Sequence, residues 1–251
     1  MAERIDDLQI KGYRIIQNPD LFCFGVDAVL LADFARVPKN GKALDLGTGN
    51  GVIPMLMEAR NEEASYVGLE IQEESASLAR RSIEMNGQQQ RISVVTGDIK
   101  NAAAIFGGST FDTVTVNPPY MNENHGLIND YSPMAIARHE LLCTLEDIIE
   151  NSAKILRPGG NFFMIHRPHR LVDIISLLRQ YRMEPKKMRF VQPFEGKEPT
   201  MVLIEASRGG KAHLKVLPPL IIHKNTKEYT EEIYKIYGYD RDTILGSNSN
   251  R

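Results

Sequence analysis

The sequence predicts an α/β fold with a seven-stranded, mostly parallel sheet, a C-terminal antiparallel pair and helices on both faces. From residue 42 onward, short apolar runs alternate with segments of helical periodicity, a pattern typical of parallel βαβ units. Two later apolar runs, over about 186–192 and 200–206, are separated only by a polar turn near 195–198. Because no helix joins them, these two strands should pair antiparallel.

Most strands of the parallel part are followed by a helical pattern. We expect strands over 42–47, 66–71, 92–96, 112–116 and 161–165, and helices over 52–60, 73–86, 145–156 and about 168–181. The second helix stops at Gly87, a residue suited to a helix C-terminus. The third begins after Thr144, an N-cap type followed three residues later by an acid, and Arg157-Pro158-Gly159-Gly160 should end it.

Three parts are expected along the chain. Residues 1–40 form an N-terminal extension that contains an apolar helix with Asp27 as its expected N-cap. Residues 41–207 form the core, interrupted by a long polar loop over 118–140 that is typical of a functional lid or of disorder. Residues 208–251 form a tail in which tyrosines lie among lysines. We expect this tail to dock as an amphipathic helix, with an RNA contact as the alternative.

Composition excludes several classes of protein. The chain is 42% hydrophobic and 25% charged, as globular proteins are. No apolar stretch approaches the ~18–20 residues that span a bilayer, and the N-terminus is too polar for a secretory signal. Cys23 and Cys143 lie outside any CxxC or His-rich setting. This favours reduced thiols in a cytoplasmic protein without a metal site or a membrane partner.

Charge is unevenly divided along the chain. Residues 1–156 carry 13 Lys and Arg against 22 Asp and Glu, whereas residues 157–215 carry 12 against 5. A basic segment beside an acidic body favours a polyanionic partner such as RNA, because Lys and Arg neutralise phosphates. A merely solvated basic face is the alternative. The candidate phosphate contacts are Arg167, Arg170, Arg179, Arg182, Lys186, Lys187 and Arg189.

A glycine-rich turn, GTGNG over 47–51, follows the first core strand and opens a helix. Such a turn lets backbone N–H groups approach a ligand. The acid before it, Asp45, suits the ammonium of an amino-acid ligand, whereas a pyrophosphate would be repelled. Glu70, at the end of the next strand, is placed to bind a ribose, and Asp98, after the third strand, an adenine amino group. Together they favour S-adenosylmethionine over NAD; turn glycines and helix caps are the alternative.

The tetrapeptide Asn117-Pro118-Pro119-Tyr120 directly follows the fourth strand. An exocyclic amine on a planar ring is a poor nucleophile, because its lone pair is delocalised. The side-chain oxygen of Asn117 and the backbone carbonyl of Pro118 could accept its two N–H bonds, and Tyr120 could stack on the base. The motif therefore predicts transfer of a methyl group to such a nitrogen. An Asn-Pro turn without a function is the alternative.

These motifs give the chain a resemblance to a known family. DLGTGNG (45–51) and NPPY (117–120) resemble those of class I methyltransferases of the small-domain type, with a Rossmann-like methyltransferase fold over about 41–165. The upstream segment FGVDAVLLADFA (24–35) adds a resemblance to bacterial tRNA adenine-N6-methyltransferases, which modify the adenosine beside the anticodon of a valine tRNA. This second resemblance covers most of the chain and implies a tRNA partner.

The resemblance implies a role for each matching position. Gly47 and Gly49 would line the methionine part of S-adenosylmethionine, Asp98 and Ile99 would bind its adenine, and the helix after Asp27 would cover it. The catalytic set would be Asn117, Pro118 and Tyr120. The cofactor set would be Asp27, Asp45, Gly47, Thr48, Gly49, Glu70, Ile71, Asp98, Ile99 and Asn117.

Other activities remain open at this level. A protein-glutamine N5-methyltransferase uses the same tetrapeptide on a carboxamide, which presents a similar pair of N–H bonds. An rRNA or DNA amino-methyltransferase is another possibility, although no separate target-recognition domain for DNA is evident. A non-catalytic RNA-binding adaptor would be free to lose Asn117 and the glycines, both of which this chain retains. We favour a monomer.

Overall fold

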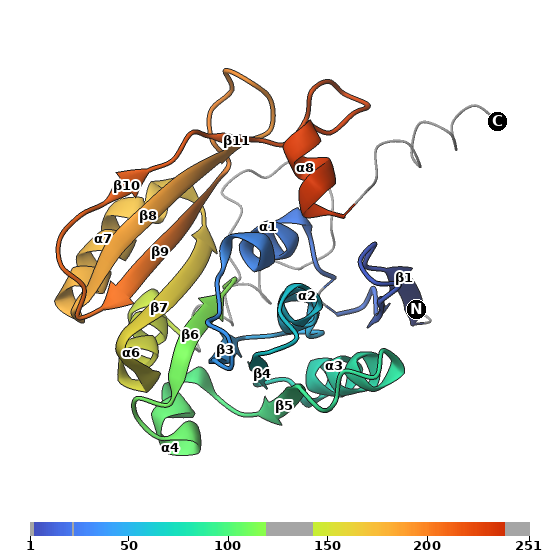
Figure 1. The fold of residues 1–251 in the computed structure, drawn as a ribbon, viewed down its shortest axis with the longest axis horizontal. Coiled ribbons are helices and arrows are strands. Elements are labelled where there is room, and N and C mark those ends of the chain that lie inside the picture. Colours follow the sequence, from blue (N-terminus) through green and yellow to red (C-terminus); the bar gives the residue numbers. More distant parts are fainter. Residues whose placement is uncertain (1–2, 22, 119–142, 239–251) are drawn as a thin grey trace.

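The protein is described from a computed structural model, and the structure describes residues 3–21, 23–118 and 143–238. Within these residues, the body is a nine-stranded sheet flanked by helices (Figure 1). The strands are β3 (Lys42–Leu46), β4 (Ser65–Glu70), β5 (Ile92–Thr96), β6 (Phe111–Val116), β7 (Leu156–His166), β8 (Met183–Gln192), β9 (Met201–Arg208), β10 (Lys215–Val216) and β11 (Leu220–Ile221). They lie in the order β10-β8-β9-β7-β6-β3-β4-β5, with β11 also on β8.

The expected fold class is confirmed. Strands β3 to β7 pair in parallel, and β9 is antiparallel to both β7 and β8. The short strands β10 and β11 add to the seven that the sequence predicts. Because the parallel strands share a direction, their carboxyl ends meet at one edge. Leu46 lies opposite both Leu69 and Val116. The next residue of each strand therefore lies at this carboxyl edge, with Gly47 between Asn117 and Glu70.

Alternation along the strands creates two apolar cores, one on each face of the sheet. In β7, Phe163 and Ile165 join one core, and Phe162 and Met164 join the other. The first core includes residues of α1 (Val26–Phe34), α2 (Val52–Arg60), α3 (Glu73–Met85) and α8 (Glu231–Ile236). The second includes residues of α4 (Ala102–Phe106), α6 (Leu145–Ile155) and α7 (Leu171–Gln180). None of the described helices is long and apolar enough to cross a membrane.

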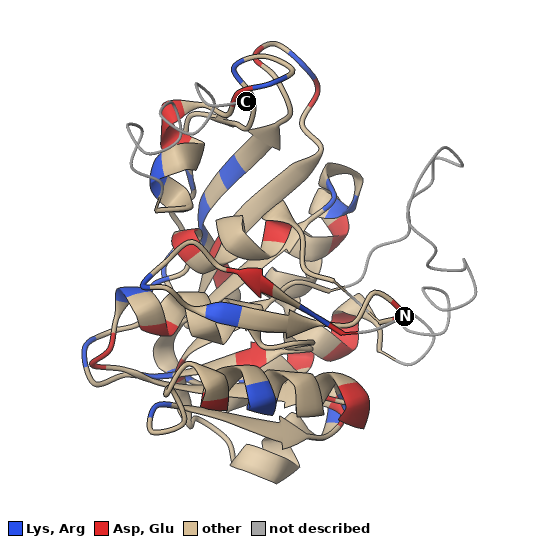
Figure 2. Cartoon of the chain, turned by 90° about the vertical axis from the view of Figure 1, so that its right-hand side faces the viewer, with Lys and Arg blue, Asp and Glu red and all other residues tan. Residues whose placement is uncertain are grey.

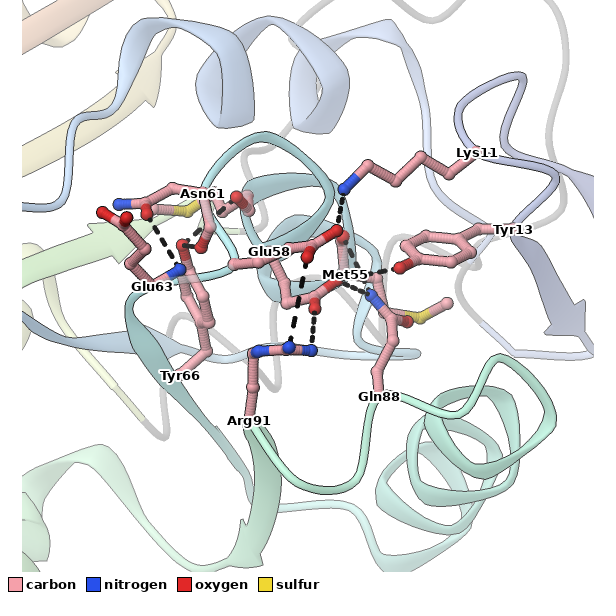
Figure 3. A network of polar contacts seen from close by, with 11 residues as sticks. Lys11, Tyr13, Met55, Glu58, Asn61, Glu63, Tyr66, Gln88 and Arg91 are labelled. Carbon is pink, nitrogen blue, oxygen red and sulfur yellow. Dashed lines mark hydrogen bonds and ion pairs between the residues drawn. The ribbon is translucent and has the colours of Figure 1, made fainter. Parts of the chain in front are cut away.

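The N-terminal residues form a hairpin that sequence patterns did not reveal. Strands β1 (Arg4–Asp7) and β2 (Arg14–Gln17) pair antiparallel, and β2 lies against α3. Between them, the Tyr13 hydroxyl donates to the buried carboxylate of Glu58 in α2 at 3.2 Å. Gln88 and Arg91 donate to the same carboxylate at 2.7 and 3.1 Å (Figure 3). This network fastens the hairpin to the body at the end of α2 away from the glycine turn.

The described part of the tail packs against the same face. Ile233 and Ile236 of α8 are buried, and Arg60 of α2 donates to the Ile236 carbonyl at 2.8 Å. Tyr229 stacks on Tyr237 with ring centroids 6.0 Å apart. The tail residues 239–251 lie outside the described chain, and the three-part division at residues 40 and 207 stays a prediction.

The structure corrects three boundaries. Asp27 is not the N-cap of α1: Gly25 holds that position with an extended backbone, and Asp27 lies in the first turn. The segment 157–160 does not separate helix from strand, because β7 begins at Leu156 with a register shift opposite β6. The helix expected over 168–181 begins as a 3-10 turn, η2 (Pro168–Arg170), before α7. By contrast, the expected Thr144 cap is confirmed, as a capping box with Asp147.

Candidate active site

The glycine turn adopts a backbone that other residues would strain. Gly47, Gly49 and Gly51 have φ of +68°, +56° and +83°. Gly51 is the N-cap of α2, so the turn and the start of the helix form one unit. The N–H groups of Gly47 and Thr48 both donate to the Leu69 carbonyl, at 2.8 and 3.0 Å. These bonds hold the turn against the carboxyl end of β4.

The glycine turn after β3 holds the side chain of Glu70, which ends the neighbouring strand β4. Its buried carboxylate accepts one bond from the Gly49 N–H and one from the Gln72 N–H, both at 2.9 Å. A carboxylate has about four lone-pair sites, so further hydroxyl donors can still bind. Ile71, directly after it, exposes 45% of its surface as an apolar face. A polar group beside an apolar one suits a ribose that carries a planar base.

Asp98 and Ile99 complete the same edge. Asp98 caps the 3-10 turn η1 (Ile99–Asn101), and its Oδ1 accepts from the Lys100 N–H at 2.9 Å. A Cβ on Gly47 would lie 3.9 Å from the Ile99 side chain, so Ile99 reaches the glycine turn. The structure therefore brings together Gly47, Glu70, Ile71, Asp98 and Ile99, which come from the ends of three adjacent strands.

Asp45 lies beneath the turn at the end of β3. The residue is 2% exposed, and its Oδ1 accepts from the Thr115 hydroxyl at 2.6 Å. Burial raises the pKa of Asp45 to about 7, although the bond from Thr115 opposes the rise. Its second oxygen, Oδ2, has no hydrogen bond of standard geometry, although the nearby Thr48 hydroxyl also opposes the rise in pKa. A cationic group placed here would stabilise the ionised carboxylate.

Unsatisfied polar atoms gather at this edge. Among the described residues, five buried side-chain polar atoms lack a partner: Asp45 Oδ2, Thr48 Oγ1, Asn50 Oδ1, Asn117 Oδ1 and Gln88 Oε1. The first four lie in or beside the glycine turn or at the end of β6. Each costs about 1–3 kcal/mol when left unpaired, so proteins keep such groups mainly where a ligand or water completes them. The oxygens of Asp45, Asn50 and Asn117 can only accept, so they call for donors such as an ammonium or hydroxyl groups. The Thr48 hydroxyl can also donate, for example to a carboxylate.

Asn117 leaves β6 next to the turn. Its Nδ2 donates to Asp27 Oδ2 at 3.0 Å, while its Oδ1 is buried without a partner. Pro118 is buried after it. Tyr120, the third predicted catalytic residue, lies outside the described residues. The structure therefore brings Asn117 together with Asp27 of α1, from which it is separated by 90 positions.

Gln17 is a residue of this region that no motif predicted. It is 2% exposed, and its Oε1 accepts from the Phe24 N–H at 3.1 Å and from Asn50 Nδ2 at 3.5 Å. Asn50 belongs to the glycine turn. The N-terminal segment thus contacts the turn itself. An isolated glutamine at the end of a four-residue strand carries no sequence signal for such a role.

Basic residues follow β7 at the carboxyl edge. Burial lowers the pKa of His166 to about 4, and the nearby charges of Arg170, His169 and Arg167 contribute. Arg167 donates to the Thr200 carbonyl at 3.0 Å, and Arg170 pairs with Asp173 at 2.9 Å.

Three other predicted phosphate contacts lie farther along the sheet and have protein partners. Lys186 donates to the Lys211 carbonyl, Lys187 pairs with Glu205, and Arg189 pairs with Glu232, at 2.7–2.8 Å. Figure 2 shows basic and acidic residues interspersed over the side of the molecule that it presents. A phosphate would have to compete with these carboxylates at Lys187 and Arg189, as it would with Asp173 at Arg170. What distinguishes Arg167 and Arg170 is their position directly after β7, the strand next to β6 and Asn117.

The two cysteines take no part in a disulfide. Burial raises the pKa of the Cys143 thiol to about 12, with Asp147 and Asp98 adding to the effect, so the thiol is a weak nucleophile. No group of three His, Cys, Asp or Glu side chains that could hold a metal ion occurs within residues 3–21, 23–118 and 143–238.

Comparison with known proteins agrees with this geometry. The family model of the methyltransferase small domain matches residues 12–190. A Porphyromonas gingivalis protein named tRNA1(Val) (adenine(37)-N6)-methyltransferase is 28% identical over 92% of this chain and 93% of its own length. A protein of the same name from Photobacterium profundum is 27% identical, over 71% of this chain and 75% of its own length.

Solved structures share the fold. A predicted O-methyltransferase from Agrobacterium tumefaciens superposes with a TM-score of 0.70 at 26% identity, covering 85% of this chain and 97% of its own. A geranyl diphosphate C-methyltransferase from Streptomyces coelicolor was crystallised with S-adenosyl-L-homocysteine. It has a TM-score of 0.54 at 13% identity, and the match covers 73% of this chain and 80% of that one. The match over residues 12–190, with the glycine turn and its acids at the carboxyl edge, shows that the chain belongs to the methyltransferase small domain family and is an S-adenosylmethionine-dependent methyltransferase.

Proposed function

We propose that this methyltransferase modifies the exocyclic N6 of adenine in RNA, and that its RNA is a tRNA whose target adenosine lies next to the anticodon, as in valine tRNA. The observation that carries the proposal is the buried, unpartnered Oδ1 of Asn117 at the end of β6. This oxygen lies at the edge where the glycine turn and Glu70 would hold the methyl donor. The names of relatives at 25–28% identity support the choice of substrate.

The site chemistry follows from the two acceptors. Asn117 Oδ1 and the Pro118 carbonyl would each accept one N–H of the amine, which holds the nitrogen in place and favours a tetrahedral geometry. When bound, S-adenosylmethionine supplies a methyl group made electrophilic by its sulfonium. On accepting that methyl group, the amine nitrogen would gain positive charge and leave the donor as a neutral thioether. Its proton then becomes acidic and passes to water, so positioning provides most of the catalysis.

Charge at the carboxyl edge favours RNA over protein as the substrate. Arg167, His169 and Arg170 follow β7, the strand next to β6, and therefore lie near Asn117. A phosphate backbone that leads to the target base would meet these groups. A protein glutamine presents a similar pair of N–H bonds but gains little from positive charge.

Transfer of labelled methyl groups from S-adenosylmethionine to total RNA and total protein tests the proposal. We expect label in the tRNA fraction, recovered as N6-methyladenosine after digestion to nucleosides. Label in protein as N5-methylglutamine, or in RNA as another nucleoside, would overturn the substrate while leaving the cofactor assignment intact. A useful control is Asn117→Ala, which should abolish transfer of label to either fraction.

A further inference from the structure

Asp27 and Asn117 form a contact that joins the N-terminal extension to the chemical site. An asparagine amide has two ends of similar shape, an acceptor oxygen and a donor nitrogen, and a flip exchanges them. Only the orientation that presents Oδ1 to the target amine can accept its N–H bond. In the structure Nδ2 faces Asp27 Oδ2 at 3.0 Å, and Oδ1 is left buried without a partner.

A carboxylate is the side chain that selects this orientation. An ionised carboxylate accepts hydrogen bonds and donates none, so it attracts the amide nitrogen and repels the amide oxygen. A bond to a charged acceptor is also about twice as strong as a neutral one. A flipped Asn117 would place its oxygen against Asp27 and turn donor hydrogens toward the amine, which is itself a donor.

The fold fixes Asp27 itself. Its Oδ1 accepts from the Ala28 N–H at 2.9 Å, in the first turn of α1, where the helix dipole favours an anion. Gly25 leaves room for the carboxylate, because a Cβ at that position would lie 2.8 Å from Asp27 Oδ1. The spacing of Gly25 and Asp27 in the sequence therefore has a packing reason that a cofactor contact alone would not supply.

We propose that Asp27 is a positioning residue, which holds the Asn117 amide with its oxygen toward the target amine. This inference rests on the proposed function, since it concerns the same amine. It gives Asp27 a role that differs from the cofactor contact expected from the sequence. In this role Asp27 acts through Asn117.

A polarity swap tests the proposal. In Asp27→Asn, one amide oxygen must serve both Ala28 and Asn117, so one bond is lost. In Asn117→Asp, two carboxylates face each other. When both substitutions are combined, the amide introduced at position 27 can accept from Ala28 and donate to the carboxylate introduced at position 117, which keeps its other oxygen for the amine. We expect each single variant to lose about 10²-fold in kcat, as small misplacements do, and the double variant to return to within about tenfold of the wild type.

Controls separate positioning from cofactor binding and from folding. Cofactor affinity, measured by calorimetry, should change less than about threefold in Asp27→Asn. A loss of tenfold, about 1.4 kcal/mol in binding free energy, would instead indicate a direct cofactor contact. Asp33→Asn changes the same helix at a half-buried ion pair with Arg60, 3.8 Å long, and should leave kcat unchanged. Single-variant losses that multiply in the double variant would overturn the proposal, as would an Asp27→Asn variant that loses cofactor affinity and keeps kcat.

A spectroscopic measurement keeps this test independent of the proposed function. Kinetics are measured on whichever acceptor the wild type methylates, RNA or protein glutamine. If it methylates neither, the proposed function fails, but the side-chain amide resonances of Asn117 still report on the contact. We expect these resonances, assigned by their loss in Asn117→Asp, to shift in Asp27→Asn and not in Asp33→Asn. Unshifted resonances would show that Asp27 does not hold the amide.

Discussion

Among single residues, Asp45 couples the site to pH. Its pKa of about 7 exceeds its ordinary 3.8 because the carboxylate is buried, so the unliganded protein holds it largely protonated below pH 7. An ammonium bound at Oδ2 needs the ionised form. Affinity for S-adenosylmethionine should therefore fall about tenfold for each pH unit below 7, because the ionised fraction of Asp45 falls tenfold. It should fall again above about pH 8, where the α-amino group of the ligand loses its proton.

Asp45→Asn checks the origin of this dependence. The amide keeps an oxygen for Thr115, so the variant should bind the cofactor more weakly and with little pH dependence. Because the folded pKa is raised, ionisation of Asp45 costs stability, and that cost grows as pH rises from about 4 through 7. The unliganded variant should therefore have a higher Tm than the wild type at pH 8 and a similar one at pH 4. A wild-type affinity that does not change between pH 5 and 8 would contradict the assignment.

Some residues of the site can be predicted from the sequence and others cannot. The turn glycines, Glu70 and Asp98 could be placed because motif and strand end coincide. Gln17 could not, since its contact with Asn50 arises only when the hairpin folds against the turn. The sequence favours Asp27 as the N-cap of α1, but Gly25 occupies that position, and its lack of a Cβ leaves space for the Asp27 carboxylate.

Among elements, the start of α2 depends on its packing against α3. Gly51 has φ of +83°, and a Cβ there would lie 3.0 Å from the Ala79 Cβ. Gly87 has a similar φ of +69° but open space around it. Strain of a positive φ costs of order 1–3 kcal/mol, and overpacking typically adds about 1–3.

Gly51→Ala should therefore lower the free energy of unfolding by about 1–3 kcal/mol more than Gly87→Ala, as measured by urea denaturation. It should also weaken cofactor binding, because the turn must move away from Ala79. Equal losses in the two variants would mean that α2 and α3 adjust without strain, and that φ alone makes glycine necessary at position 51.

Short elements were the part of the fold that periodicity missed. Strands β1 and β2 are four residues each, too short for an alternating pattern to stand out, and β10 and β11 have two residues each. Long apolar strands such as β7 were found, because both faces of the sheet are covered and their burial demands continuous apolar residues.

Over the whole molecule, the division of charge between the two halves of the sheet indicates where a polyanion would lie. The basic segment forms β7 to β10, one half of the sheet, and the acidic residues before it form the other half (Figure 1). The two halves meet between β6 and β7, beside Asn117. A backbone lying on the basic half could thus place one base at the carboxyl edge, with Arg167 and Arg170 nearest to it.

The paired variant Arg167→Glu/Arg170→Glu should weaken tRNA binding and reduce the dependence of log K on log salt by about one unit per lost phosphate contact. Cofactor affinity should stay unchanged, because neither residue belongs to the glycine turn or its acids. Lys39→Glu gives the matched control: its side chain is 81% exposed and precedes β3, at the opposite edge of the sheet. Filter binding across a salt series measures both slopes. If Lys39→Glu alters the slope as much as the paired variant does, the RNA is held by general charge rather than by the residues beside Asn117.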